Sequence, residues 1–140
     1  MERRFHMLLI RTLNVHQKRS QSQFIELGLS PGQPKILERL KEMDGCMQKE
    51  LAAACHVEPA TITSILPGME KNGLIKRENK TYISGKRSLS VSLTEKGHLM
   101  EREVARIVDE VEELSFNGFT KEERDSFLSM IERVYENIKL

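Results

Sequence analysis

Cationic side chains near the middle of this sequence are the groups best suited to binding another molecule. Lys86 and Arg87 follow a glycine in a short polar stretch, and Arg77 precedes that stretch. Such side chains bind the phosphate oxygens of nucleic acids. Residues 71–96 hold seven Lys or Arg against two acids (+5), whereas residues 97–140 hold six against eleven (−5). This polarity, concealed by an overall charge of +1, favours a DNA-binding protein with an acidic scaffold.

No arrangement of side chains indicates an enzyme. The four histidines are scattered along the chain: His6, His16, His56 and His98. The sequence contains no HExxH, CxxC, glycine-rich phosphate loop or paired-carboxylate signature. We therefore expect no catalytic residue, no metal site and no cofactor. We predict that the protein is not an enzyme.

The two cysteines, Cys46 and Cys55, are too few for a disulfide framework. Cys55 follows a short amphipathic stretch at a position that faces inward, which predicts a small buried thiol. A redox role for Cys46 is left open by the pattern.

Two short helices joined by a tight turn are predicted between residues 48 and 72. The first, about 48–55, and the second, starting at Pro59, each carry an apolar face: Leu51, Ala52 and Cys55, then Ile62, Leu66 and Met69. Pro59 suits a first helical turn, and Asn72-Gly73 suits a left-handed stop. A helix-turn-helix of this kind holds its second helix against the major groove of DNA.

A β-hairpin is predicted directly after these helices, at about residues 75–93. Its two extended runs flank a basic tip, Ser84-Gly85-Lys86-Arg87. Two helices followed by such a hairpin predict a winged helix-turn-helix. The alternative is a helical hairpin followed by an unrelated β-hairpin.

The order of these motifs resembles the MarR family of bacterial transcriptional regulators. The resemblance rests on QKELAAACHVEPATITSILPGMEKNGLIKR followed by GKRSLSVSLTEKG, and it spans nearly the whole chain. It implies a mostly α fold with a small β-wing, formed by a DNA-binding lobe (30–97) and by helices that dimerise (1–28 and 98–140). Redox-sensing members keep a reactive cysteine in the first helix, where this sequence has none.

Long amphipathic helices are predicted at both ends of the chain. The first runs from about Arg3 to Leu27, and the last two start after Thr94 and Thr120, which with Glu123 forms a capping box. They carry more apolar surface than one small domain can cover, which favours a symmetric dimer. A monomeric helical bundle is the alternative.

Another helix, which starts near residue 30 and precedes the helix-turn-helix, is predicted to begin with a capping box. Ser30 is its cap, Pro31 its first residue and Gln33 the reciprocal partner. Pro34 is unusual at this place because it removes an intrahelical N–H donor.

The recognition helix is the second helix of the helix-turn-helix, which starts at Pro59. Its face opposite the core carries no Arg, Asn or Gln side chain that could bind a base through two hydrogen bonds. A rotation of about 100° per residue places on or beside that face Ala60, Thr61, Thr63, Ser64, Pro67, Gly68 and Lys71. Many family members carry arginines there, whereas this chain offers hydroxyls and a methyl. Specificity then comes either from these hydroxyls with methyl contacts to thymine, or from groove shape sensed by the wing.

The wing and two further side chains complete the predicted DNA-binding set. Many MarR proteins carry Asp-Arg-Arg where this chain has Gly85-Lys86-Arg87, and the last arginine enters the minor groove. The resemblance thus implies a DNA contact by Arg87. Arg77 and Gln48 are placed to contact phosphates.

Pro67 lies in the interior of the predicted recognition helix. A proline there frees the carbonyl of Thr63 and costs about 3 kcal/mol. We predict a kink between these two residues.

These observations predict a cytoplasmic, sequence-specific transcriptional regulator, since no membrane span or signal peptide is evident. We expect a homodimeric repressor on a pseudo-palindromic operator with half-sites about 34 Å apart. The resemblance implies a small-molecule effector, for which Met7, Met43 and Met100 are weak pocket candidates. The alternative is a winged-helix dimer that mainly binds protein, with weak or residual DNA binding.

Overall fold

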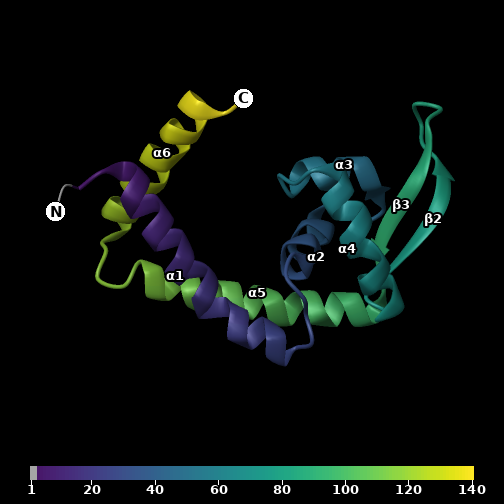
Figure 1. The fold of residues 1–140 in the computed structure, drawn as a ribbon, viewed down its shortest axis with the longest axis horizontal. Coiled ribbons are helices and arrows are strands. Elements are labelled where there is room, and N and C mark those ends of the chain that lie inside the picture. Colours follow the sequence, from purple (N-terminus) through teal and green to yellow (C-terminus); the bar gives the residue numbers. More distant parts are fainter. Residues whose placement is uncertain (1–2) are drawn as a thin grey trace. The chain divides into compact units, whose positions relative to one another are not determined.

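The computed structural model describes residues 3–140 and contains helices and short strands in a mostly α arrangement (Figure 1). Their order is α1 (Phe5–Glu26), α2 (Gln33–Glu42), β1 (Cys46–Met47), α3 (Gln48–Ala54), α4 (Pro59–Lys71), β2 (Ile75–Thr81), β3 (Arg87–Leu93), α5 (Glu95–Ser115) and α6 (Lys121–Ile138). Two compact units, Met1–Val108 and Asp109–Leu140, are described separately below. The predicted fold class is confirmed. The boundaries predicted for the DNA-binding lobe and the dimerisation helices stay a prediction.

The predicted helix-turn-helix is present as α3 and α4. His56, at φ 56°, takes the left-handed conformation in the turn, and the Val57 N–H donates to the carbonyl of Ala52 (3.2 Å). Pro59 occupies the start of α4, where its missing N–H costs nothing. Gly73, at φ 76°, follows the end of α4 as predicted.

The wing is an antiparallel hairpin of β2 and β3, which projects beyond α4 in Figure 1. Its tip is closed by two backbone hydrogen bonds, from the Tyr82 N–H to the Lys86 carbonyl and from the Gly85 N–H to the Tyr82 carbonyl, both 2.8 Å. The sheet also contains β1, so that its strand order is β1-β3-β2. β1, in which Cys46 pairs with Val91, was not predicted from the sequence.

The predicted start of α2 is wrong. The carbonyl of Ser30 accepts the N–H of Gln33 (3.1 Å) across a Pro31-Gly32 turn, with Gly32 at φ 87°, so the helix begins at Gln33 instead of Pro31. One half of the predicted capping box survives, since the Ser30 N–H donates to Gln33 Oε1 (3.1 Å). Pro34 is therefore in the first helical turn, where it removes no intrahelical bond.

One hydrophobic core joins α2, α3, α4, the sheet and the start of α5. Its buried residues are Leu29, Ile36, Leu37, Leu40, Cys46, Leu51, Ala52, Cys55, Ile62, Leu66, Met69, Leu74, Ile75, Val91, Leu93 and Val104. Most come from the faces that the sequence periodicity identifies. The burial of the Cys55 thiol is confirmed. α4 runs through Pro67 without a break, and the predicted kink between Thr63 and Pro67 stays a prediction.

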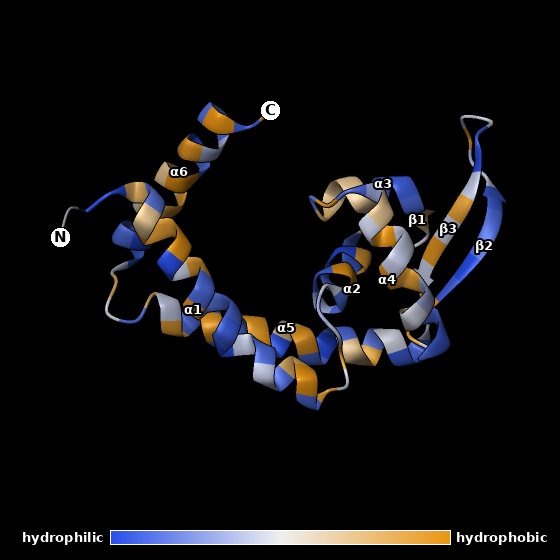
Figure 2. Cartoon of the chain, in the orientation of Figure 1, coloured by the Kyte–Doolittle hydropathy of each residue, from blue (hydrophilic) through white to orange (hydrophobic). Residues whose placement is uncertain are grey.

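α1 begins at Phe5 and ends at Glu26, slightly inside the predicted bounds, and α1 has no buried residue. α5 is capped as predicted, because the Gly97 N–H donates to Thr94 Oγ1 (3.0 Å). In Figure 2 the ribbon of α1 carries hydrophobic residues along its length. No helix of residues 3–140 is long and apolar enough to cross a membrane.

The second unit contains the end of α5 and the whole of α6. Thr120 and Glu123 form the predicted capping box, with bonds of 3.0 and 2.9 Å. Three phenylalanine rings pack edge to face at centroid distances of 5.3 to 6.5 Å: Phe116, Phe119 and Phe127. Arg124 lies over the Phe116 ring and bonds Glu112 (3.4 Å). As in α1, no residue of α6 is buried.

Cys46 is a buried free thiol, and its surroundings disfavour the thiolate. Burial, with the negative charge of Glu50 as the next cause, raises the pKa of Cys46 to about 11. Because the thiolate is the nucleophile, we expect alkylation of native Cys46 by iodoacetamide to be slow at neutral pH and to accelerate as the pH rises toward 11. Urea-denatured protein, in which the thiol regains its ordinary pKa, is the control. Equally rapid alkylation of the native and denatured protein at neutral pH would contradict the prediction.

Candidate nucleic-acid interface

The face of α4 that sequence analysis assigns to DNA is exposed. Ala60, Thr61, Thr63 and Ser64 all lie at the surface, while Ile62 is buried on the opposite side. Two of the hydroxyls bond to the helix backbone. Thr63 Oγ1 donates to the Pro59 carbonyl (3.0 Å) and Ser64 Oγ donates to the Thr61 carbonyl (2.9 Å). The surface is thus a short array of hydroxyl and methyl groups on a rigid helix.

The wing tip presents cations at the surface. Lys86 and Arg87 are both exposed, at the turn and at the start of β3. Next to its tip, the wing is attached to the loop before β1, because the Tyr82 hydroxyl donates to the Gly45 carbonyl (3.2 Å). Lys80 lies over the Tyr82 ring, with its ammonium 5.6 Å from the centroid. The wing is therefore anchored at Tyr82, whereas the Lys86 and Arg87 side chains are exposed and accessible to a ligand.

Two predicted site residues have partners within the protein. Arg77, at the start of β2, donates to Gln48 Oε1 and to Glu70 Oε1, both at 3.3 Å. Gln48, at the start of α3, donates through Nε2 to Thr63 Oγ1 (3.3 Å). The structure thus brings together three residues that sequence analysis selected separately, and it adds Glu70, which sequence analysis missed.

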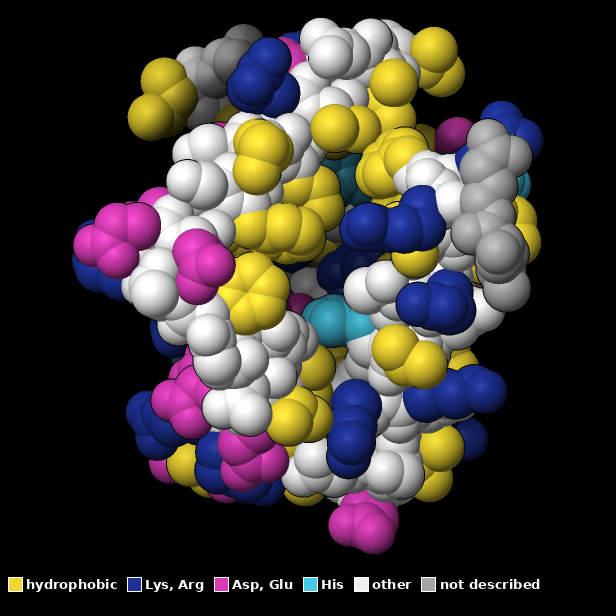
Figure 3. Space-filling model, turned by 90° about the vertical axis from the view of Figure 1, so that its left-hand side faces the viewer, with side chains coloured by type: hydrophobic (Ala, Val, Ile, Leu, Met, Phe, Trp, Pro, Cys, Tyr) yellow, Lys and Arg dark blue, Asp and Glu magenta, His cyan; other side chains and the backbone are white. Residues whose placement is uncertain are grey.

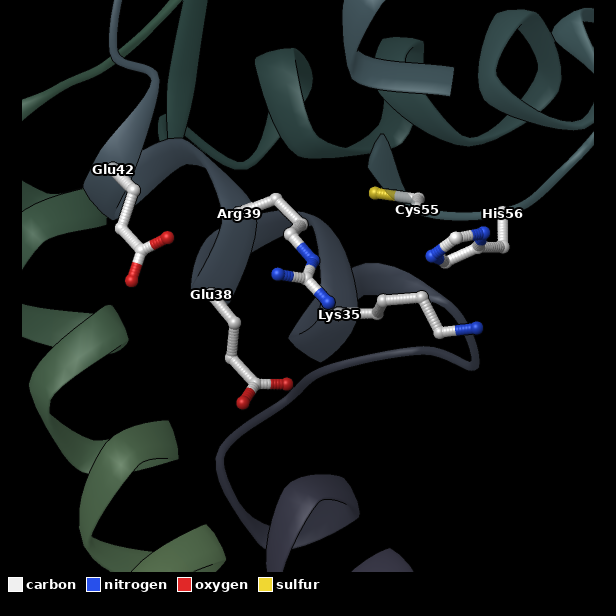
Figure 4. A pocket seen from close by; sticks show the side chains of 6 residues that line it. All are labelled: Lys35, Glu38, Arg39, Glu42, Cys55 and His56. Atoms are coloured by element: carbon white, nitrogen blue, oxygen red, sulfur yellow. The ribbon is translucent and has the colours of Figure 1, made fainter. Parts of the chain in front are cut away.

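A polar cavity lies between α2 and the turn after α3 (Figure 4). Its volume is about 320 Å³, and it is lined by Lys35, Glu38, Arg39, Glu42, Cys55 and His56. Burial raises the pKa of Glu38 and of the Cys55 thiol. The methionines suggested for a pocket do not line this cavity. Met43 and Met100 pack against the core, and Met7 is exposed.

Within residues 3–140, no group of three or more His, Cys, Asp or Glu side chains is placed to hold a metal ion.

His98 lies 3.9 Å from Asp44, which itself accepts the Leu93 N–H (2.8 Å) at the end of the wing. Asp44 therefore has a structural role at the junction of the sheet and α5.

Comparison with known proteins identifies the family. The model of the MarR family matches residues 29–81, which include α2, α3, α4 and β2. The HTH-type transcriptional repressor YetL of Bacillus subtilis is 30% identical over 120 residues, which cover 84% of this chain and 70% of YetL. The chain belongs to the MarR family. A second Bacillus subtilis relative, the HTH-type transcriptional regulator YybA, is 28% identical over 120 residues and covers 86% of this chain and 79% of YybA.

Solved structures agree with this membership in the MarR family. A putative MarR regulator from Listeria monocytogenes, crystallised with 26mer DNA, has a TM-score of 0.84 and 26% identity, covering 99% of this chain and 90% of that one. The winged helix-turn-helix and the family resemblance are thus confirmed. This MarR-family chain is a transcriptional regulator and not an enzyme.

Sequence analysis also missed a hydrophobic side chain at the wing tip of this MarR-family chain. Ile83 is fully exposed there, beside Lys86 and Arg87. It lies on the hairpin turn, where strand alternation no longer indicates which side chains face outward.

Proposed function

We propose that this MarR-family protein is a homodimeric repressor that binds a pseudo-palindromic DNA operator and is released by a small-molecule effector. The observation that carries the proposal is the exposed hydroxyl face of α4 together with the cationic tip of the wing. The Listeria relative crystallised with DNA and the relative named as a repressor support it.

The proposed DNA contacts divide between the two grooves. Ala60, Thr61, Thr63 and Ser64 meet base edges in the major groove, where hydroxyls and methyls give modest discrimination. Arg87 enters the adjacent minor groove, and Lys86 neutralises a phosphate. Since α4 carries no arginine on this face, the wing supplies much of the affinity.

The dimer is proposed from the exposed apolar surface of the terminal helices. On α1 these side chains are Phe5, Met7, Leu9, Ile10, Leu13, Val15 and Ile25, and on α6 they are Phe127, Met130, Ile131, Tyr135 and Ile138. Figure 3 shows hydrophobic side chains exposed at the surface among charged ones. A surface of this extent on helices without a buried residue requires a partner, and a second copy supplies a self-complementary one.

The cavity between α2 and the turn after α3 is the proposed effector site. Lys35 and Arg39 line it together with Glu38 and Glu42, all four from α2 (Figure 4), so its lining suits a small polar ligand that carries both hydrogen-bond donors and acceptors. At about 320 Å³ the space matches a small effector. An effector bound here contacts the turn between α3 and α4 and can bias the position of α4.

Binding to duplex DNA from immediately upstream of the gene, against a shuffled duplex and across a salt series, tests the function. We expect preferential binding that weakens steeply with salt because phosphate neutralisation releases counterions. Arg87→Ala should weaken it at least about tenfold, since a dimer loses two groove contacts. Lys121→Ala, which removes an exposed cation on α6, is the matched control and should bind as the wild type does.

Weak, equal binding of the wild-type protein to both duplexes would overturn this operator assignment. The bare face of α4 would then favour the second candidate function, a winged-helix dimer that mainly binds protein.

A further inference from the structure

Arg77 connects the wing to both helices of the helix-turn-helix. Its side chain is only 18% exposed, and its guanidinium bonds Glu70 of α4 through Nη2 and Gln48 of α3 through Nη1. The planar fork of arginine can hold two acceptors at once, which an ammonium group on a flexible stem cannot do with the same geometry. Arg77 thus lies at the junction of three elements, with two of its donors in use.

The hydrogen bonds that run from Arg77 through Gln48 and Thr63 to Pro59 all have the same donor-to-acceptor direction. Arginine has donors and no acceptor, so the Gln48 oxygen must face it. The Gln48 Nε2 then faces Thr63 and donates to its hydroxyl oxygen (3.3 Å). The Thr63 hydroxyl in turn uses its proton on the Pro59 carbonyl (3.0 Å).

This direction fixes what Thr63 can offer a ligand. Its proton is used on Pro59 and one lone pair is used by Gln48, so the exposed hydroxyl has one acceptor position left. In the major groove, adenine and cytosine present exocyclic amines as donors, whereas guanine presents the N7 and O6 acceptors. The Thr63 hydroxyl in this state matches an amine and does not match the guanine edge.

We propose that Arg77 is a positioning residue that, through Gln48, holds Thr63 as a hydrogen-bond acceptor for an adenine or cytosine amine of the operator. The inference rests on the proposed DNA-binding function. Glu70 completes the arrangement, because its carboxylate holds the second arm of the guanidinium. Arg77 therefore acts on operator choice from a place where its own charge is already engaged.

A direct phosphate contact by Arg77 would have a different experimental signature. Removing a phosphate contact weakens binding about equally for all sequences and lowers the slope of log K against log salt by about 0.9 for each phosphate. Loss of a positioning residue lowers operator affinity, leaves binding to the shuffled duplex unchanged and keeps the slope. The ratio of the two affinities therefore separates the roles.

The test measures operator and shuffled-duplex binding for Arg77→Lys and Arg77→Met across a salt series. We expect both variants to lose about tenfold in the operator-to-shuffled ratio with an unchanged slope, since one misplaced base contact costs about one decade. The proposal is overturned if Arg77→Lys keeps the wild-type operator-to-shuffled affinity ratio while Arg77→Met lowers the slope of log K against log salt. Lys76→Met is the control, because Lys76 is exposed, lies next to Arg77 and takes no part in the chain of bonds.

A double-mutant cycle tests the route through Thr63. Thr63→Val removes the hydroxyl and keeps the shape, so Arg77→Lys should cause no further loss of discrimination in that background. Thr61→Val, at a neighbouring exposed threonine, should instead combine additively with Arg77→Lys. The proposal is overturned if the losses caused by Thr63→Val and Arg77→Lys add together, or if Thr63→Val alone leaves the operator-to-shuffled affinity ratio unaltered.

Gln48→Met provides a variant that removes no charge. It interrupts the bonds between Arg77 and Thr63, and it should reproduce the loss of discrimination while circular dichroism shows an unchanged fold. An unaltered ratio in this variant overturns the inference. If the wild-type protein itself fails to prefer the operator, the proposed function fails first, which distinguishes the two failures.

Discussion

Gly97→Ala is expected to destabilise the fold by about 3 kcal/mol or more, because there is no space for a side chain at this position. Gly97 is buried in the first turn of α5. A Cβ added there would lie 2.0 Å from the carbonyl oxygen of Leu74 and 3.2 Å from Leu93 Cδ2. The nearest atom belongs to the backbone, so no rotamer change relieves the clash.

The clash at Gly97 also affects the junction between the wing and α5. The Leu74 carbonyl that would be displaced accepts the Thr94 N–H (3.1 Å), and Thr94 is the cap of α5. Displacing Leu74 therefore weakens a backbone bond and a helix cap together. Urea unfolding at fixed protein concentration measures the loss, since the stability of an oligomer depends on concentration.

Gly68→Ala is the matched control in a second helix, and its expected effect has the opposite sign. A Cβ added at Gly68 would lie 3.6 Å from Gln33 Nε2, an ordinary contact. Alanine is favoured over glycine in a helix interior by about 1 kcal/mol, so this variant should be more stable than the wild type. A destabilised Gly68→Ala variant, or an unchanged Gly97→Ala variant, would contradict the packing described here.

The predictable parts of the fold are those specified by neighbouring residues. Pro59 and Gly73 mark the two ends of α4, and Thr94 and Thr120 mark the starts of α5 and α6, because a cap acts within one helical turn. The wing is equally local, since its two strands follow each other directly. Helix periodicity then identifies the exposed face of α4 without any knowledge of its neighbours.

The errors arise where signals compete or where partners are distant in sequence. At the start of α2, the Ser30 cap signal competes with a Pro31-Gly32 turn, and the turn prevails because Gly32 adopts a left-handed conformation. β1 is two residues long and acquires its identity only by pairing with β3. No local pattern indicates such a strand.

The candidate site shows the same limit at the level of side chains. Gln48 and Arg77 were predicted from the sequence as two separate phosphate contacts, and their mutual hydrogen bond was missed because 29 positions separate them. Their pairing depends on the packing of both α3 and β2 against α4. The types of residue at a site can be predicted from sequence, whereas their tertiary hydrogen-bond partners require the fold.

Leu13→Glu is expected to convert the protein from a dimer to a monomer. Leu13 is 50% exposed on α1, four and eight residues after Leu9 and Phe5, which places all three on one side of the helix. In a symmetric interface one substitution introduces two carboxylates, neither with a designed partner, into apolar surroundings. Analytical ultracentrifugation should show half the wild-type mass.

The control for this variant is Asn79→Glu, which adds the same charge at an exposed position of β2. Asn79 lies outside the two terminal helices whose apolar side chains are proposed to dimerise, so this variant should remain dimeric. A dimeric Leu13→Glu variant would exclude Leu13 from the interface. A monomeric wild type would favour the helical-bundle alternative.

Dimerisation and DNA contact can be separated by comparing Leu13→Glu with Arg87→Ala. A dimer binds its second half-site at a high effective concentration, so the monomeric variant should lose about a hundredfold or more in operator affinity. Its slope against salt should also fall to about half, because one protomer neutralises half the phosphates. Arg87→Ala should retain the dimeric mass while its affinity falls. If Leu13→Glu were monomeric and bound the operator with wild-type affinity and slope, each protomer would read DNA alone, and the pseudo-palindrome would have no physical basis.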